Sequence, residues 1–157
     1  MTPLYKTLGY AGALPFILCA LGLLVFHGAL GTALLSVQLI YAGLILSFLG
    51  GVHWVHAFPR SSEGQMLLAI APSILALILN SLAFLSLFSG WFSPILQTLI
   101  CTFTLIIYLF GFIFMYATDL QSLDQEEFPD DYMDFRLKVT ILVCAALGVS
   151  AMAIWMQ

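Results

Sequence analysis

The stretch that decides the fold is residues 7–59, TLGYAGALPFILCALGLLVFHGALGTALLSVQLIYAGLILSFLGGVHWVHAFP, which holds no Asp, Glu, Lys or Arg over 53 residues. A helix rises about 1.5 Å per residue and the hydrocarbon core of a bilayer is about 30 Å thick, so this stretch is too long for one crossing and fits two. Residues 64–118 form a second such stretch of 55 residues, and residues 139–157 form a third of 19. The sequence therefore predicts two transmembrane hairpins and one final crossing.

The composition of the chain agrees with this count of crossings. It is 62% hydrophobic and 8% charged, with a mean hydropathy of +1.09, whereas soluble domains are about a quarter charged. We expect an all-α integral membrane protein, with five transmembrane helices in one compact bundle and a single membrane domain over residues 1–157. The expected spans are about 8–26, 34–58, 66–88, 95–117 and 137–156, with an acidic loop at 118–136.

The four basic residues indicate how the chain is oriented. Five crossings place them all on one side, and they are Lys6, Arg60, Arg136 and Lys138. Because basic residues favour the cytoplasmic side, the N-terminus and the acidic loop are expected in the cytoplasm and the C-terminus outside. A bacterial inner membrane is the simplest location for such a multi-pass chain. The net charge of −4 comes almost wholly from the acidic loop, so there is no basic footprint for nucleic acid.

The second expected span carries a pattern of small residues. Gly43, Ser47 and Gly51 recur every four residues, with Gly50 beside them, and such a pattern lets two helix backbones approach closely in a membrane. The face that carries the pattern comprises Ser36, Ile40, Gly43, Ser47, Gly50 and Trp54, which lie within about 60° of one another on a helix. We favour packing against a neighbouring span. The alternatives are a homodimer contact and a groove for a lipid or quinone tail.

Two histidines lie near the cytoplasmic end of the same span. His53 and His56 are three residues apart, so their side chains can point to one site, and a carboxylate such as Asp119 could complete a metal site there. Two histidines beside Trp54 at a helix end are also typical of the interfacial belt of membrane proteins. Because two ligands are too few to specify a metal, we favour the interfacial interpretation and expect neither a metal nor another cofactor.

The acidic loop ends in a segment with the features of a helix start. Pro129 is followed by two aspartates, which suit the positive end of a helix dipole. Tyr132 and Arg136 are then expected to anchor the chain at the headgroups. We interpret this segment as an interfacial elbow that leads into the fifth span, and the alternative is a docking surface for a basic partner.

Asp, Glu, Lys, Arg and His are absent from the expected middle of every span. Proton- or ion-coupled carriers usually place such a group in their pathway, so the sequence argues against a carrier. Asn80 is the most polar residue expected near mid-bilayer. A buried amide of this kind usually joins two helices through a hydrogen bond.

The segment Tyr41–Trp54, YAGLILSFLGGVHW, resembles the signature of a family of small bacterial and mitochondrial membrane proteins that includes transmembrane protein sixty-nine. Further matching pieces are Gly12–Phe16, Ala71–Ser73, Pro129–Tyr132, Phe135–Leu137 and Thr140. The chain departs from the family pattern at Asp131, where an aromatic residue is expected. The resemblance implies a multi-span inner-membrane protein and supplies no activity or ligand.

Two classes of function fit these features. The first is a non-enzymatic membrane protein that packs with a membrane partner or with another copy of itself, or assists the assembly of a larger complex in the bilayer. The absence of Asp, Glu, Lys, Arg and His from the expected middle of the spans favours this class. The alternative is a protein that binds a lipid, a quinone or a metal through the Gly43–Trp54 groove with His53 and His56.

Overall fold

The computed structural model describes residues 3–60, 63–122 and 131–156, and for residues 55–60 and 122 it describes the backbone helix alone. The described residues form five helices: α1 (Pro3–Val25), α2 (Gly28–Arg60), α3 (Glu63–Phe88), α4 (Pro94–Ser122) and α5 (Tyr132–Ala153). Each helix contains a segment long and apolar enough to cross a bilayer. The prediction of an all-α bundle of five membrane-crossing helices is therefore confirmed.

Several helix ends differ from those predicted, because the helices continue into residues expected in turns and loops. α2 begins at Gly28, a glycine with a φ of 62°, which suits a left-handed turn residue. The helix then runs through Thr32, whose hydroxyl donates to the Gly28 carbonyl at 3.1 Å. α4 extends to Ser122 and α5 begins at Tyr132. Asp119 and Arg136, which bound most of the predicted loop, consequently lie within helices.

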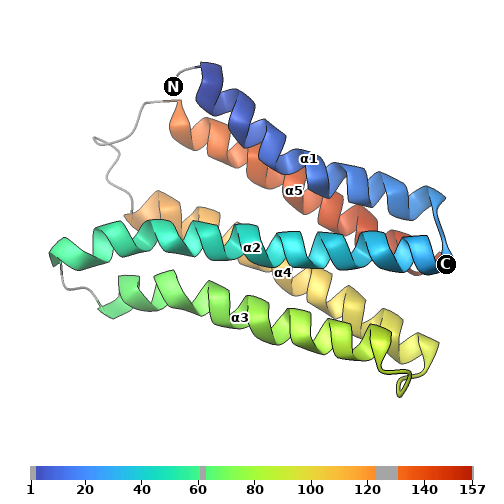
Figure 1. The fold of residues 1–157 in the computed structure, drawn as a ribbon. Helices are drawn as coiled ribbons and strands as arrows, with labels where there is room; N and C mark the ends of the chain where they lie inside the picture. Colours follow the sequence, from blue (N-terminus) through green and yellow to red (C-terminus); the bar gives the residue numbers. More distant parts are fainter. Residues whose placement is uncertain (1–2, 61–62, 123–130, 157) are drawn as a thin grey trace.

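Helices that follow one another in the chain run in opposite directions, whereas the packed pairs α1–α5 and α2–α4 each run in the same direction (Figure 1). α2 packs most extensively on α3, and α5 packs on both α1 and α4. Figure 1 shows α1 and α5 side by side, although they are farthest apart in the sequence. The side chains that are fully buried at the centre include Phe16, Leu39, Leu46, Leu105, Tyr108, Phe112 and Leu147.

The two ends of the bundle differ in charge. One end, which we call the charged end, is formed by the starts of α1, α3 and α5 and by the last turns of α2 and α4. It carries the described charged residues Lys6, Glu63, Asp119, Asp131, Asp134, Arg136 and Lys138. The opposite, uncharged end carries the exposed Trp91 and Trp155. All the described charges therefore lie at one end of the bundle.

Candidate functional site

A buried polar cluster joins three helices at the charged end. His53 comes from α2, Asp119 from α4 and Arg136 from α5. The Nη2 atom of Arg136 donates to Oδ2 of Asp119 at 2.7 Å, and Nε2 of His53 lies 3.3 Å from Oδ1 of the same carboxylate. We call these residues the His53–Asp119–Arg136 cluster. Asp119 is its centre, because each of its two oxygens faces a different helix.

The cluster is shielded from its surroundings. His53 is 0% exposed, Asp119 3% and Arg136 8%. A second nitrogen of Arg136, Nη1, donates to the hydroxyl of Thr140 at 3.4 Å, one turn further along α5. Buried ions are tolerated when they are paired with an opposite charge and hydrogen-bonded. This arrangement meets that condition and ties α2, α4 and α5 together.

Beside the cluster lies a cavity of about 480 Å³, which we call the charged-end cavity. Its polar groups come from Arg136, Thr140 and the two tyrosines Tyr5 and Tyr132, and most of its wall is apolar. The other lining residues are Leu8, Gly9, Gly12 and Phe16 from α1, Ile45, Phe48, Leu49 and Val52 from α2, Phe112 from α4, and Phe135, Val139 and Val143 from α5. An apolar pocket with a few polar groups at one place is the usual form of a small-molecule site.

The cavity exists because α1 and α2 separate toward the charged end. Nearer the uncharged end they are joined, since the Tyr41 hydroxyl donates to the Gly12 carbonyl at 2.9 Å and the Phe16 and Tyr41 rings are 5.0 Å apart. Figure 1 shows the two helices diverging beyond this point. Leu8 and Phe48 line the cavity from the two diverging helices and are 59% and 70% exposed. The cavity thus opens sideways, toward the lipid that surrounds a membrane bundle.

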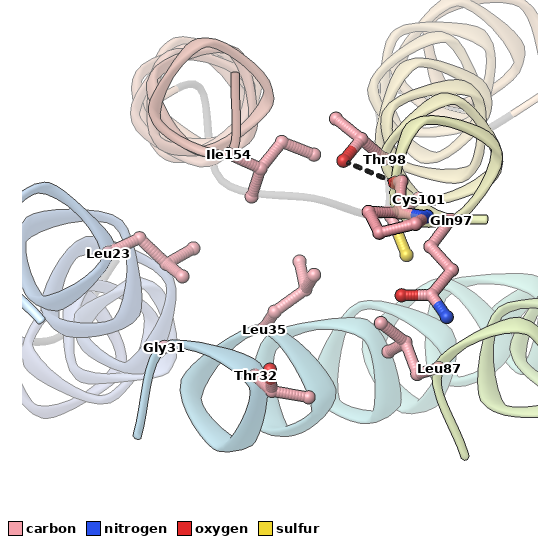
Figure 2. Close-up of a pocket in the computed structure, with 10 residues that line it drawn as sticks. Leu23, Gly31, Thr32, Leu35, Leu87, Gln97, Thr98, Cys101 and Ile154 are labelled. Atoms are coloured by element: carbon pink, nitrogen blue, oxygen red, sulfur yellow. Dashed lines mark hydrogen bonds between the residues drawn. The ribbon is translucent and has the colours of Figure 1, made fainter. Parts of the chain in front are cut away.

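A smaller hollow of about 160 Å³ lies at the uncharged end. Figure 2 shows Leu23, Leu35 and Ile154 pointing into it, with Gln97 and Thr98 on one side. The polar groups there are bonded to nearby backbone, because the Gln97 amide donates to the Phe92 carbonyl and the Thr98 hydroxyl to that of Pro94. The charged-end cavity is about three times larger and has a buried ion pair at its edge, so it is the stronger candidate.

A family model described as "Protein of unknown function (DUF3429)" matches residues 1–152. The chain belongs to this family. Comparisons with curated proteins and with solved structures find no match. The family covers nearly the whole chain and carries no described activity, so the chemistry of this DUF3429 protein has to be argued from its own residues.

The small residues of α2 in the DUF3429 protein face α3 and α4 at two of the four positions. A Cβ atom on Gly43 would lie 2.7 Å from the Asn80 amide nitrogen, and one on Gly50 would lie 2.9 Å from the Ala69 carbonyl oxygen. Ser47 is half-buried and donates to the Gly43 carbonyl at 2.7 Å. Gly51 differs from the prediction, because a Cβ atom there would meet nothing within 4 Å. Seven residues are almost two full turns, so Gly50 rather than Gly51 shares the face of Gly43.

The Gly43–Trp54 face is consequently filled by protein along the part that holds Gly43 and Gly50. Trp54 is half-buried. The other side of the same segment, at Ile45, Phe48 and Val52, lines the charged-end cavity. The favoured interpretation of this face was packing against a neighbouring span, and the close surroundings of Gly43 and Gly50 agree with it. The alternative of a ligand groove on this face stays a prediction.

Of the polar residues predicted for a metal site or for the membrane interface, the structure brings some together. His53 and Asp119 meet as described, whereas the side chain of His56 and all of Pro129 lie outside the described residues. Among the described residues there is no group of three or more His, Cys, Asp or Glu able to hold a metal ion. Arg136 places a cation on the second oxygen of Asp119, where a metal would compete with it. The expected lack of a metal stays a prediction.

Arg136 and Tyr132 depart from the expected role of headgroup anchors. Arg136 is buried because it lies one turn into α5, on the side that faces Asp119 in α4. Tyr132 is half-buried and lines the charged-end cavity. The sequence offered one signal for this arrangement, since Asp119 directly follows one apolar stretch and Arg136 lies three residues before the next. Thr140 carried no such signal.

Asn80 lies where a helix-joining amide was expected. Its Oδ1 atom accepts a hydrogen bond of 3.0 Å from the hydroxyl of Tyr108, which links α3 to α4. Tyr108 is fully buried. The predicted interhelical bond of Asn80 is confirmed.

Proposed function

We propose that this DUF3429 protein binds one amphipathic membrane molecule, a lipid or a quinone, in the charged-end cavity. The observation that carries the proposal is the cavity itself, an apolar space of about 480 Å³ with Arg136 and Thr140 at one end. Pockets of about 300–1,000 Å³ hold small-molecule ligands in proteins. The apolar wall suits a chain and the polar end suits a head group.

The position of the opening supports entry from the bilayer. Leu8 of α1 and Phe48 of α2 flank the opening and are both more than half exposed. A ligand dissolved in lipid can reach the cavity between these helices without crossing water. The inner end is closed by the packed rings of Phe16 and Phe112, whose centroids are 5.7 Å apart. A chain that enters would therefore end against a fixed aromatic wall.

A role in holding or assembling membrane partners, with no enzymatic activity, remains compatible with this proposal. A bound lipid or quinone can be cargo or a structural component as well as a substrate. The location in a bacterial inner membrane, the cytoplasmic placement of the charged end and the relation to transmembrane protein sixty-nine are likewise part of the proposal. They are supported by the basic residues on one side and by the resemblance of Tyr41–Trp54.

The binding proposal is tested with a matched pair of valines on α2. Val52 lines the charged-end cavity, whereas Val37 is 53% exposed on the lipid side of the same helix. Val52→Trp should fill the cavity and Val37→Trp should leave it open. The proteins are purified in mild detergent, and the molecules extracted with each are identified by mass spectrometry.

We expect the wild type and Val37→Trp to carry the same co-purified amphipath, and Val52→Trp to carry at least about tenfold less, since a filled site loses the burial that holds the ligand. An equal load on all three proteins would overturn the proposal. An empty wild-type protein whose Tm does not rise with any added lipid or quinone would overturn it as well, because a ligand that binds the folded state raises Tm.

A further inference from the structure

We infer that the ligand of the charged-end cavity is of the quinone type, with an uncharged ring head that accepts a hydrogen bond from Arg136 and a single apolar chain that lies along α1. This inference rests on the binding role proposed above and adds the chemical class of the ligand. Three features of the described residues carry it: the charge balance at the polar end, the donors that remain there, and the shape and aromatic character of the wall.

The charge at the polar end is already balanced. Arg136 and Asp119 form an ion pair of 2.7 Å, and their side chains are 10% and 4% exposed. A head group that bonds to Arg136 also lies close to the carboxylate of Asp119. An anionic head would be attracted by Arg136 and repelled by Asp119 over similar distances, so the two effects largely cancel. It would still lose the water that hydrates its charge. An uncharged head avoids that cost, so fatty acids and acidic phospholipids are disfavoured.

The donors at the polar end call for an acceptor on the ligand. A guanidinium has five N–H groups and no acceptor. Asp119 and Thr140 accept from two of its nitrogens, and Tyr132 lines the cavity beside it. N–H groups remain after these bonds are counted, and Arg136 lines the cavity. A carbonyl oxygen of a ring head can accept from this side chain, whereas an apolar head would leave its donors without a ligand partner.

The shape and the aromatic residues of the wall favour a ring on one chain. Tyr132 and Phe135 lie beside Arg136 at the polar end, and aromatic faces pack well against a planar ring. The lining residues of α1 run from Tyr5 to Phe16, which is about 16 Å of helix. A volume of about 480 Å³ is in the range of one drug-sized ligand. Both dimensions suit a single chain better than the two chains of a diacyl lipid.

The test compares probes that share a ten-carbon chain and differ in the head. They are decyl-benzoquinone, which is neutral and accepts hydrogen bonds, decanoate, which is anionic, and decylbenzene, which has no acceptor. Didecanoyl glycerol is added as a neutral two-chain lipid. Binding to the purified wild-type protein is measured as a rise in Tm and by titration. We expect the quinone to bind about tenfold tighter than each of the other three.

The variant Asp119→Asn tests whether the charge balance, rather than a preference of the cavity for ring-shaped heads, excludes an anionic ligand. Asp119→Asn keeps the size of the side chain and an oxygen for Arg136, but it removes the negative charge. The site then carries the uncompensated charge of Arg136, so decanoate should bind about tenfold tighter than to the wild type. The double variant Asp119→Asn with Arg136→Gln is neutral again and should lose that gain. The comparison of probes on the wild type needs no variant, so it stands even if Asp119→Asn does not fold.

The outcomes distinguish the quinone assignment from the binding role. If decanoate, decylbenzene or didecanoyl glycerol binds as tightly as the quinone, and Val52→Trp abolishes that binding, the cavity binds ligands but the quinone assignment is wrong. An unchanged affinity of Asp119→Asn for decanoate would also contradict the charge argument. If no probe binds and Val52→Trp has no effect on Tm or on co-purified molecules, the binding role itself is overturned.

Discussion

Gly50 and Gly51 are adjacent glycines with opposite surroundings, and they offer a prediction at the scale of single residues. A Cβ atom on Gly50 would lie 2.9 Å from both the Ala69 carbonyl oxygen and Pro72 Cγ, and neither can move away easily because one is backbone and the other a ring. Gly50→Ala should therefore lower the free energy of unfolding by about 1–3 kcal/mol. Gly51→Ala meets nothing within 4 Å and should be neutral or stabilising by up to about 1 kcal/mol. Thermal unfolding in detergent measures both, and equal Tm values would contradict the packing of α2 on α3.

The same residues show what the sequence can and cannot predict at this scale. The spacing of small residues predicted a close-packing face on α2, and Cβ atoms on Gly43 and Gly50 would lie within 3 Å of α3 atoms. The spacing did not distinguish Gly50 from Gly51. Steps of four residues from Gly43 lead to Gly51, whereas two full helical turns, about seven residues, lead to Gly50. The alternative of a polar or metal site grouped His53 with Asp119, and His53 Nε2 lies 3.3 Å from Asp119 Oδ1. The favoured interfacial role of His53 does not fit its complete burial. Arg136 was missed as their partner, because a basic residue near a helix start is usually a headgroup anchor.

At the scale of helices, hydropathy predicted the five elements but not their neighbours. Lipid is as apolar as a leucine side chain, so hydrophobicity does not select which transmembrane helices pair. The α1–α5 contact depends instead on shape: a Cβ atom at Gly9 would overlap the ring of Phe135, and the Tyr10 and Phe135 rings meet edge to face at 5.2 Å. The charged-end cavity could not be predicted either, since it results from the divergence of α1 and α2.

An ion pair between α1 and the residue before α5 gives a prediction for pH. Lys6 Nζ lies 2.6 Å from an oxygen of Asp131, and its hydrogen bond and charge lower the pKa of that carboxyl from 3.8 to about 2. Because the folded pKa is below the unfolded one, the stabilisation is present above about pH 4 and is lost as the pH falls toward about 2. Asp131→Asn should remove this part of the acid sensitivity of Tm. Asp134→Asn is the control, since the ion pair of Asp134 with Lys138 lies within α5. Identical acid profiles for both variants would contradict the role of Lys6.

For the whole molecule, the distribution of basic residues predicts which side of the membrane each end faces. All of the described charges lie at one end of the bundle, and the four Lys and Arg residues belong to the segments at that end. The burial of Arg136 in an ion pair does not alter its side, and the rule counts basic residues near the ends of the spans. With five helices, the C-terminal end of α5 lies on the opposite side from the start of α1.

We therefore expect alkaline phosphatase fused after residue 157 to be active and a fluorescent protein at the same position to be dark. Fusions between α4 and α5 should show the reverse pattern, which serves as the internal control. Active phosphatase between α4 and α5 together with a fluorescent C-terminal fusion would invert the orientation, while equal signals at both positions would contradict the five crossings.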